Sequence, residues 1–369
     1  MKNIFKKYLI ILFLSIGISL VYADKEQFVV NLDDPYAYFS RDQDKQTQYS
    51  KDFLVIYDAG KENKAVLVND KLAITDVELP KDISNKGEKL DQLVNIGYNN
   101  ILILTTNEQS NSNFAYIFSI NDLLDEEKSK DFIKLKLPNG YNPTITYNGE
   151  NWSNHIAQYF TFAVTEDKLG SSLVSVYLLQ SSKNDNVYSD FKELNQFKMP
   201  NISAKHIELG TISSPNPTPG RGYDFLSTLI YKNDDTNDIK ACILTPGLFN
   251  DVKCNSINET GNFENPTLAS LLQNNNVAIV ANATDTNNIY TSTFDKQSFE
   301  ISPIVNIRNQ GNDIDAAALD ISPNNIANTE NREYIIAETF RTSENSVGFS
   351  RYSYKKEVAF MDSLVIDKL

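Results

Sequence analysis

One unit recurs about six times along this chain of 369 residues. It consists of an apolar strand, a turn rich in Asn, Asp and Ser, a second strand rich in aromatic residues, and a weaker strand that often ends in Pro. A period of roughly 50 to 60 residues is typical of a β-propeller or a related array rather than of separate domains. We therefore predict an all-β fold, a β-propeller with about six blades of about four antiparallel strands each.

The second repeat illustrates how we divide the chain into strands. Residues 90–96 form the first predicted strand of the blade, 101–105 and 115–120 form a hairpin, and 132–137 form the last, outer strand. The hairpin strands are almost continuously apolar, as in strands that are buried on both faces, whereas the closing strand alternates apolar and polar residues like a half-exposed edge. A two-sheet sandwich or a solenoid is an alternative, but neither explains the repeated rhythm as simply.

The same interpretation assigns the remaining strands. Comparable closing strands begin at Ala73, Phe191, Val252, Ser298 and Glu357. A further strand at 27–32 precedes the first repeat, and we expect it to complete the last blade and so remove an open edge. The best helix signal is 121–130, one or two turns on a connection.

The first residues have the pattern of an export signal. Lys2, Lys6 and Lys7 are followed by an apolar stretch at 8–21, and Ala23 supplies a small residue at the cleavage point. The alternative is an uncleaved anchor helix, but the apolar run is shorter than the roughly 20 residues that span a bilayer. We predict a cleaved signal peptide at 1–23 and a single propeller domain at 24–369, periplasmic or secreted, from a bacterial-type cell.

The charge of the chain limits its partners. The formal charge is -14, and it becomes about -17 without the lysines of the signal. Nucleic-acid binding depends on neutralising phosphates with Lys and Arg, so we exclude a nucleic-acid partner. The mature protein has no other long apolar segment, so we expect no membrane insertion, and we expect a monomer.

Cys242 and Cys254 are the only cysteines. An even pair in an exported protein is first interpreted as a disulfide, and a hairpin centred near Leu248 would place the two residues opposite each other. Two free thiols are the alternative. A metal site formed by two Cys without a nearby His does not fit the usual zinc ligand sets.

No motif predicts a catalytic centre, a cofactor or a metal site. Only two histidines are present, His155 and His206, and the chain lacks the Gly-x-Ser-x-Gly elbow of many hydrolases. Acidic pairs suited to glycoside chemistry are possible but unspecific among 48 acidic residues. Asn- and Asp-rich turns such as 233–238 lack the Gly and distal Glu of a calcium loop, and ordinary turn chemistry explains them.

Two connections depart from the repeat and attract the functional prediction. Residues 147–158 concentrate Tyr147, Trp152 and His155, and 213–223 hold Arg221 between two glycines after three prolines. Aromatic and Arg side chains on rigid loops commonly anchor interfaces. We predict a binding module for a protein or glycan ligand; the alternative is a carbohydrate-active hydrolase or lyase with carboxylates at the propeller axis, or two loops that merely pack together.

Overall fold

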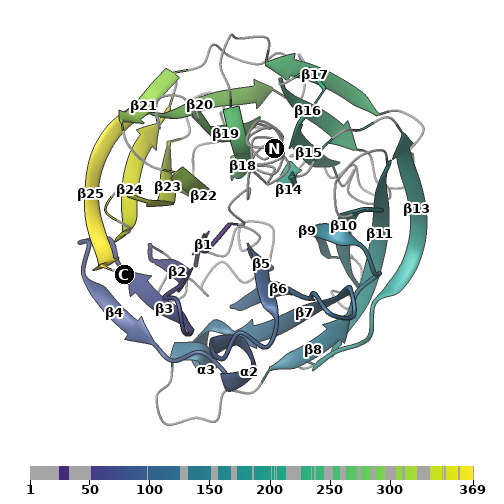
Figure 1. Ribbon diagram of the computed structural model, residues 1–369. Helices are drawn as coiled ribbons and strands as arrows, with labels where there is room; N and C mark the ends of the chain where they lie inside the picture. Colours follow the sequence, from purple (N-terminus) through teal and green to yellow (C-terminus); the bar gives the residue numbers. More distant parts are fainter. Residues whose placement is uncertain are drawn as a thin grey trace, which may run out of the picture.

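The computed structural model describes residues 25–32 and 51–368, the second range with gaps in the connecting segments. The longest gaps are 125–131, 151–156, 168–172, 213–225, 245–251, 258–262, 296–304 and 322–332. Six antiparallel sheets stand around a central axis (Figure 1), and sheets that follow each other along the chain are neighbours in the ring. The predicted all-β propeller is confirmed. Each sheet is called a blade below, and blades are numbered in chain order.

The first three blades contain all the described helices. Blade 1 consists of β1 (Gln27–Asn31), β2 (Phe53–Asp58), β3 (Asn63–Val68) and β4 (Ile74–Val77). After α2 (Lys81–Ser84), blade 2 consists of β5 (Lys89–Asn95), β6 (Asn100–Asn107), β7 (Ser112–Ser119), α3 (Ile120–Leu124) and β8 (Ile133–Lys136). Blade 3 consists of β9 (Tyr141–Glu150), β10 (Ala157–Thr165), β11 (Leu173–Asn184), β12 (Val187–Tyr188) and β13 (Lys192–Pro200).

The last three blades have four strands each, as does every other blade except blade 3, where the two-residue β12 makes a fifth. Blade 4 consists of β14 (Ile207–Ile212), β15 (Leu226–Lys232), β16 (Ile239–Leu244) and β17 (Lys253–Ile257). Blade 5 consists of β18 (Phe263–Leu271), β19 (Asn276–Ala283), β20 (Asn288–Asp295) and β21 (Val305–Asn309). Blade 6 consists of β22 (Asn312–Asp320), β23 (Tyr334–Arg341), β24 (Ser346–Tyr354) and β25 (Val358–Lys368).

The core lies between neighbouring blades rather than inside a single layer. One cluster joins Phe28 and Val30 of β1 to Leu93 of β5 and Ile103 of β6. Another joins blade 6 to blade 1 through Phe349 and other residues. The second strand of blade 2 is buried along nearly its whole length, whereas the outer strand β13 is mostly exposed. The predicted gradient from buried inner strands to exposed edges is therefore present.

The first strand occupies a different place from the one predicted. β1 pairs with β2 and is the innermost strand of blade 1, while blade 6 is built entirely from residues after 311. The prediction that this strand completes the last blade is wrong. An apolar five-residue strand fits any inner position, and its partner is decided by contacts that are distant in sequence.

Two further expectations fall partly outside the described residues. β21, the outer strand of blade 5, is described at Val305–Asn309, and the expected start at Ser298 lies outside the described residues. The helix expected at 121–130 is described as α3 as far as Leu124, and 125–130 lie outside the described residues. Within the described ranges, no helix is both long and apolar enough to cross a membrane.

Candidate functional site

Three of the predicted ligand-binding residues lie outside the described residues. These are Trp152 and His155, in the connection from β9 to β10, and Arg221, in the connection from β14 to β15. Both connections join the first strand of a blade to the second, and β9 and β14 are neighbours in the ring. The roles of all three residues stay predictions.

Tyr147 is the described member of this set. It lies on β9, its side chain is buried, and its hydroxyl donates a hydrogen bond to Gln158 Oε1. Its ring packs 5.2 Å from the ring of Phe160. These contacts give Tyr147 a place in the core between blades, and its predicted role in ligand binding stays a prediction.

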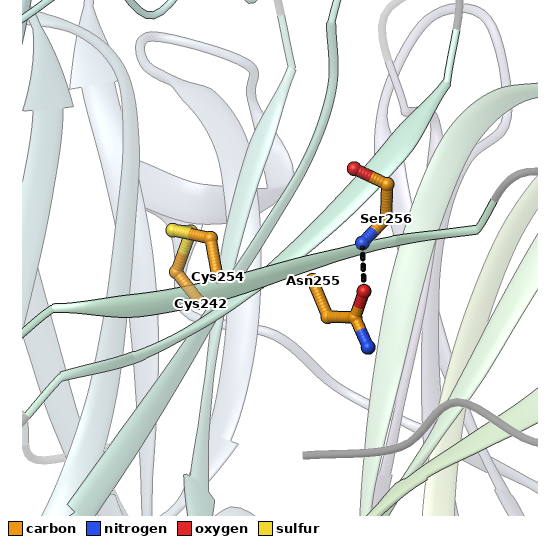
Figure 2. Close-up of a disulfide and its surroundings, with 4 residues drawn as sticks. All are labelled: Cys242, Cys254, Asn255 and Ser256. Carbon is orange, nitrogen blue, oxygen red and sulfur yellow. Dashed lines mark hydrogen bonds between the residues drawn. A yellow bond between two sulfur atoms is a disulfide. The ribbon is translucent and has the colours of Figure 1, made fainter.

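The two cysteines are joined as predicted. Cys242 on β16 and Cys254 on β17 are directly opposite in the strand register, and Figure 2 shows the bond between their sulfurs. Just beyond, the Ser256 N–H donates a 2.8 Å hydrogen bond to Asn255 Oδ1. The disulfide thus fastens the outermost strand of blade 4 to the strand beside it, and it lies away from the axis.

A repeated contact joins the innermost strands at the axis. In four pairs of neighbouring blades, a polar side chain of one innermost strand accepts a hydrogen bond from a backbone N–H of the next. We call this contact an inter-blade clasp. The clasps, at 2.7–2.9 Å, run from Ile145 N–H to Gln92, Leu209 N–H to Thr144, Leu268 N–H to Glu208, and Val29 N–H to Asp315.

The clasps occupy equivalent positions in the blades. Each donor directly follows the residue at the acceptor's position in its own blade, so Leu209 follows Glu208 and Leu268 follows Thr267. Between blades 5 and 6 the contact is instead a 3.2 Å hydrogen bond from Thr267 Oγ1 to Asp315 Oδ1. Buried polar groups must be paired in this way to offset their desolvation.

Lys25 enters the ring from the segment before β1 and joins three of these residues. Its Nζ lies 2.6 Å from Glu208 Oε2, 2.7 Å from Asp315 Oδ1 and 3.1 Å from Thr267 Oγ1. Its side chain is only 7% exposed. We call Lys25, Glu208, Thr267 and Asp315 the axial cluster; its three partners come from blades 4, 5 and 6.

The electrostatics of the axial cluster favour a charged Lys25 and a charged Glu208. Burial by itself would lower the pKa of Lys25, but the charges of Asp315 and Glu208 raise it. Burial would raise the pKa of Glu208, but Lys25 and the nearby His206, at 3.7 Å, lower it to about 2. Burial raises the pKa of Asp315, which Lys25 opposes and Glu208 reinforces.

The axial cluster is built to hold an ammonium group. One cation shared by two buried carboxylates and a hydroxyl satisfies groups that would be costly to bury alone. Among the residues that the structure describes, no group of three or more His, Cys, Asp or Glu is placed to hold a metal ion. The turn at 233–238 is closed by Asn233 Oδ1, which accepts the N–H groups of Asp235 and Thr236, as in an Asx turn.

The sequence contains a signal for the clasps that our predictions did not use. Asn-Pro-Thr occurs at 142–144 and again at 265–267; Thr144 forms a clasp, and Thr267 occupies the equivalent position in its blade. In β9 and β18 a register shift falls directly before this Thr, so that it faces the neighbouring blade. Similar shifts precede Gln92 in β5 and Asp315 in β22.

Comparisons with known proteins add little to this description. No protein-family model matches the chain. No curated protein sequence matches it. Solved structures with similarity include an exo-beta-1,3-galactanase from Phanerochaete chrysosporium with beta-1,3-galactotriose (10% identity, TM-score 0.42), covering 76% of this chain and 64% of that one. The WD40 domain of Toxoplasma gondii coronin gives 6% identity and a TM-score of 0.40, covering 76% and 63%.

A third similar structure is the complex of the fission yeast SREBP-SCAP binding domains, with 10% identity, a TM-score of 0.42, and 86% and 73% coverage. The chain therefore spans less than two thirds of the galactanase and coronin chains. All three TM-scores are below 0.5, and the fold assignment depends on the strand topology described above.

Proposed function

We propose that this propeller is an exported binding module for a protein or glycan ligand, released by cleavage after Ala23 and acting in the periplasm or outside the cell. The ligand is engaged by the two loops that carry Trp152, His155 and Arg221, with Tyr147 at the base of the first. The protein acts as a monomer and needs no cofactor.

The observation that carries this proposal is the position of Lys25 at the axis. The alternative function, a hydrolase or lyase, needs two carboxylates with a substrate or water between them. Glu208 and Asp315 are the pair that such an enzyme would use, since they come from different blades at the axis. Lys25 Nζ lies within hydrogen-bond distance of both, so the space between them is filled by the protein itself.

The topology supports the choice of loops. The connections that hold Trp152 and Arg221 both follow innermost strands, β9 and β14, which contact each other. They therefore leave blades 3 and 4 at the same end of the ring. A ligand that spans both loops would be held by aromatic and guanidinium groups, the residue types that dominate binding energy at interfaces.

The test uses the protein that begins at Asp24, immobilised as bait for envelope extracts and for a glycan array. We expect Trp152→Ala combined with Arg221→Ala to abolish capture. The matched control is Phe360→Ala with Lys355→Ala, which removes an exposed aromatic and an exposed cation from the rim. Capture by the control but not by the loop variant supports the proposal, and equal capture by both contradicts it.

A further inference from the structure

Among the described residues, two of the six seams between blades lack a clasp: blades 5 and 6 are joined by the Thr267–Asp315 hydrogen bond instead, and blades 1 and 2 have no polar contact at this position. In blade 1 the clasp position is occupied by Phe28. Its side chain has no polar atom and therefore cannot accept a hydrogen bond from a backbone N–H of blade 2. The seam between β1 and β5 is held instead by apolar packing and by a 2.9 Å hydrogen bond from Asn95 Nδ2 to the Asn31 carbonyl. The contact between these two blades thus differs from the four clasped contacts.

A cavity of about 470 Å³ lies at this seam. Phe28 of blade 1 and Leu90 of blade 2 form part of its wall, and the turn between β6 and β7 forms another part. Its volume falls within the range of small-molecule sites and is too small for a folded partner. Both apolar wall residues are buried, so the surface that a ligand would meet is polar.

The cations of the cavity wall are already paired within the chain. Lys25 belongs to the axial cluster. Lys86 forms an ion pair with Asp58 and donates a 2.9 Å hydrogen bond to the Gly60 carbonyl. Lys89 lies 3.7 Å from Asp91. An anionic ligand would have to displace one of these pairs, so the wall does not favour anions.

The acids of the wall are paired too, with one exception. Glu26 forms an ion pair with Arg341, and Glu88 binds Lys134 at 2.6 Å. Burial would raise the pKa of Glu88, but its hydrogen bonds with Lys134 and two hydroxyl groups lower it. Glu108 is the one acid of the wall that has no cation partner among the described residues.

The groups left for a ligand are the Glu108 carboxylate and the side-chain amides beside it. Glu108 and Gln109 are exposed, and Asn107 uses its Oδ1 to accept the Ser110 N–H, which leaves its amide donors. Carboxylates accept hydrogen bonds from hydroxyl groups, and side-chain amides both donate to and accept from them. A single carboxylate among paired charges attracts a hydroxyl donor without requiring a charged ligand.

We propose that the cavity between blades 1 and 2 is a binding site for a neutral, hydroxyl-rich small molecule of the carbohydrate class. Glu108 and Gln109 hydrogen-bond its hydroxyl groups, and the paired cations around them give an anionic ligand no free partner. None of the described wall residues belongs to the connections that carry Trp152 and Arg221, so this proposal is tested independently of the binding function proposed for them.

The experiment is a titration of the mature chain by calorimetry with maltose, lactose and cellobiose as neutral probes. Glucuronate serves as the anionic probe, and N-acetyl-triglycine amide as a neutral peptide probe. We expect at least one neutral sugar to bind with a dissociation constant of about 1 mM or lower. Glu108→Ala with Gln109→Ala should weaken that binding about tenfold or more, as expected for lost hydrogen bonds to a charged acceptor.

The matched control is Glu193→Ala with Gln196→Ala, the same two residue types on the exposed strand β13. It should bind the neutral sugar like the unaltered protein. The proposal is overturned if no neutral sugar binds, if glucuronate or the peptide binds more tightly, or if the Glu108 and Gln109 variant binds as well as the control. Circular dichroism of each variant verifies that the fold is retained.

Discussion

At the scale of single residues, the axial cluster joins charged side chains that are far apart in the sequence. Lys25 meets partners that are 183, 242 and 290 residues away in sequence. A lysine beside a predicted cleavage site and two acids among 48 carry no local pattern, so this cluster could not be predicted from the sequence. The disulfide could be predicted from the sequence, because Cys242 and Cys254 are the only two cysteines and flank one predicted turn.

The pH dependence of stability tests the charge state of Glu208. Its pKa falls from an ordinary 4.5 to about 2 on folding, so its contribution is complete above pH 4.5 and is lost as the pH falls toward 2. The contribution of Asp315 to the pH dependence of stability has the opposite sign, because its pKa is raised and its protonation favours the folded state. We expect Glu208→Gln to lose less stability than the unaltered protein between pH 4.5 and 2.

The measurement is urea unfolding at several pH values. Asp315→Asn serves as the comparison, because Asn retains an oxygen that accepts the Val29 N–H, and it should lose at least as much stability between pH 4.5 and 2 as the unaltered protein. An identical pH profile for Glu208→Gln and the unaltered protein would show that Glu208 does not carry the charge.

At the scale of strands, the hairpins were predictable and the positions of single strands were not. Runs such as β6 are apolar enough to require burial on both faces, and Asn at the turn after them stabilises the reversal. β1 was misplaced, because a short apolar strand fits several partners. The clasp positions escaped prediction for a different reason: they depend on register shifts inside the strands.

One close contact between strands gives a steric prediction. Gly348 on β24 lies directly opposite Phe340 on β23, and a Cβ at Gly348 would come within 2.3 Å of the ring. We expect Gly348→Ala to destabilise the protein by about 1–3 kcal/mol through overpacking. At Gly87 the nearest atom to an added Cβ is 3.9 Å away, so Gly87→Ala is the control. Equal urea unfolding midpoints for the two variants would contradict the expected overpacking at Gly348.

The disulfide gives a second prediction at this scale. Replacing Cys242 and Cys254 with Ser should lower stability by up to about 3 kcal/mol, because the bond closes a short loop in the unfolded chain. Unfolding by urea measures the loss. Thiol labelling of the denatured, non-reduced protein should detect no free thiol, and two labelled thiols would contradict the disulfide.

At the scale of the whole molecule, the ring closes without exchanging a strand between its ends. Blade 6 is held to blade 1 by side chains: Asp315 accepts the Val29 N–H, Arg341 pairs with Glu26, and Arg351 donates a 3.0 Å hydrogen bond to the Asp70 carbonyl. Closure therefore depends on residues at the start of the chain meeting residues near its end. Lys25 extends this closure across the axis to blade 4.

The central claim is that Lys25 and Glu208 form a structural ion pair that closes the ring and fills the axis. A double-mutant cycle with Lys25→Met and Glu208→Gln, measured by urea unfolding at pH 7, tests it most directly. We expect Lys25→Met alone to cost about 3–5 kcal/mol, because it leaves buried carboxylates unpaired. The coupling energy between the two sites should be about 1–3 kcal/mol. Additive effects, within about 0.5 kcal/mol, would contradict the claim.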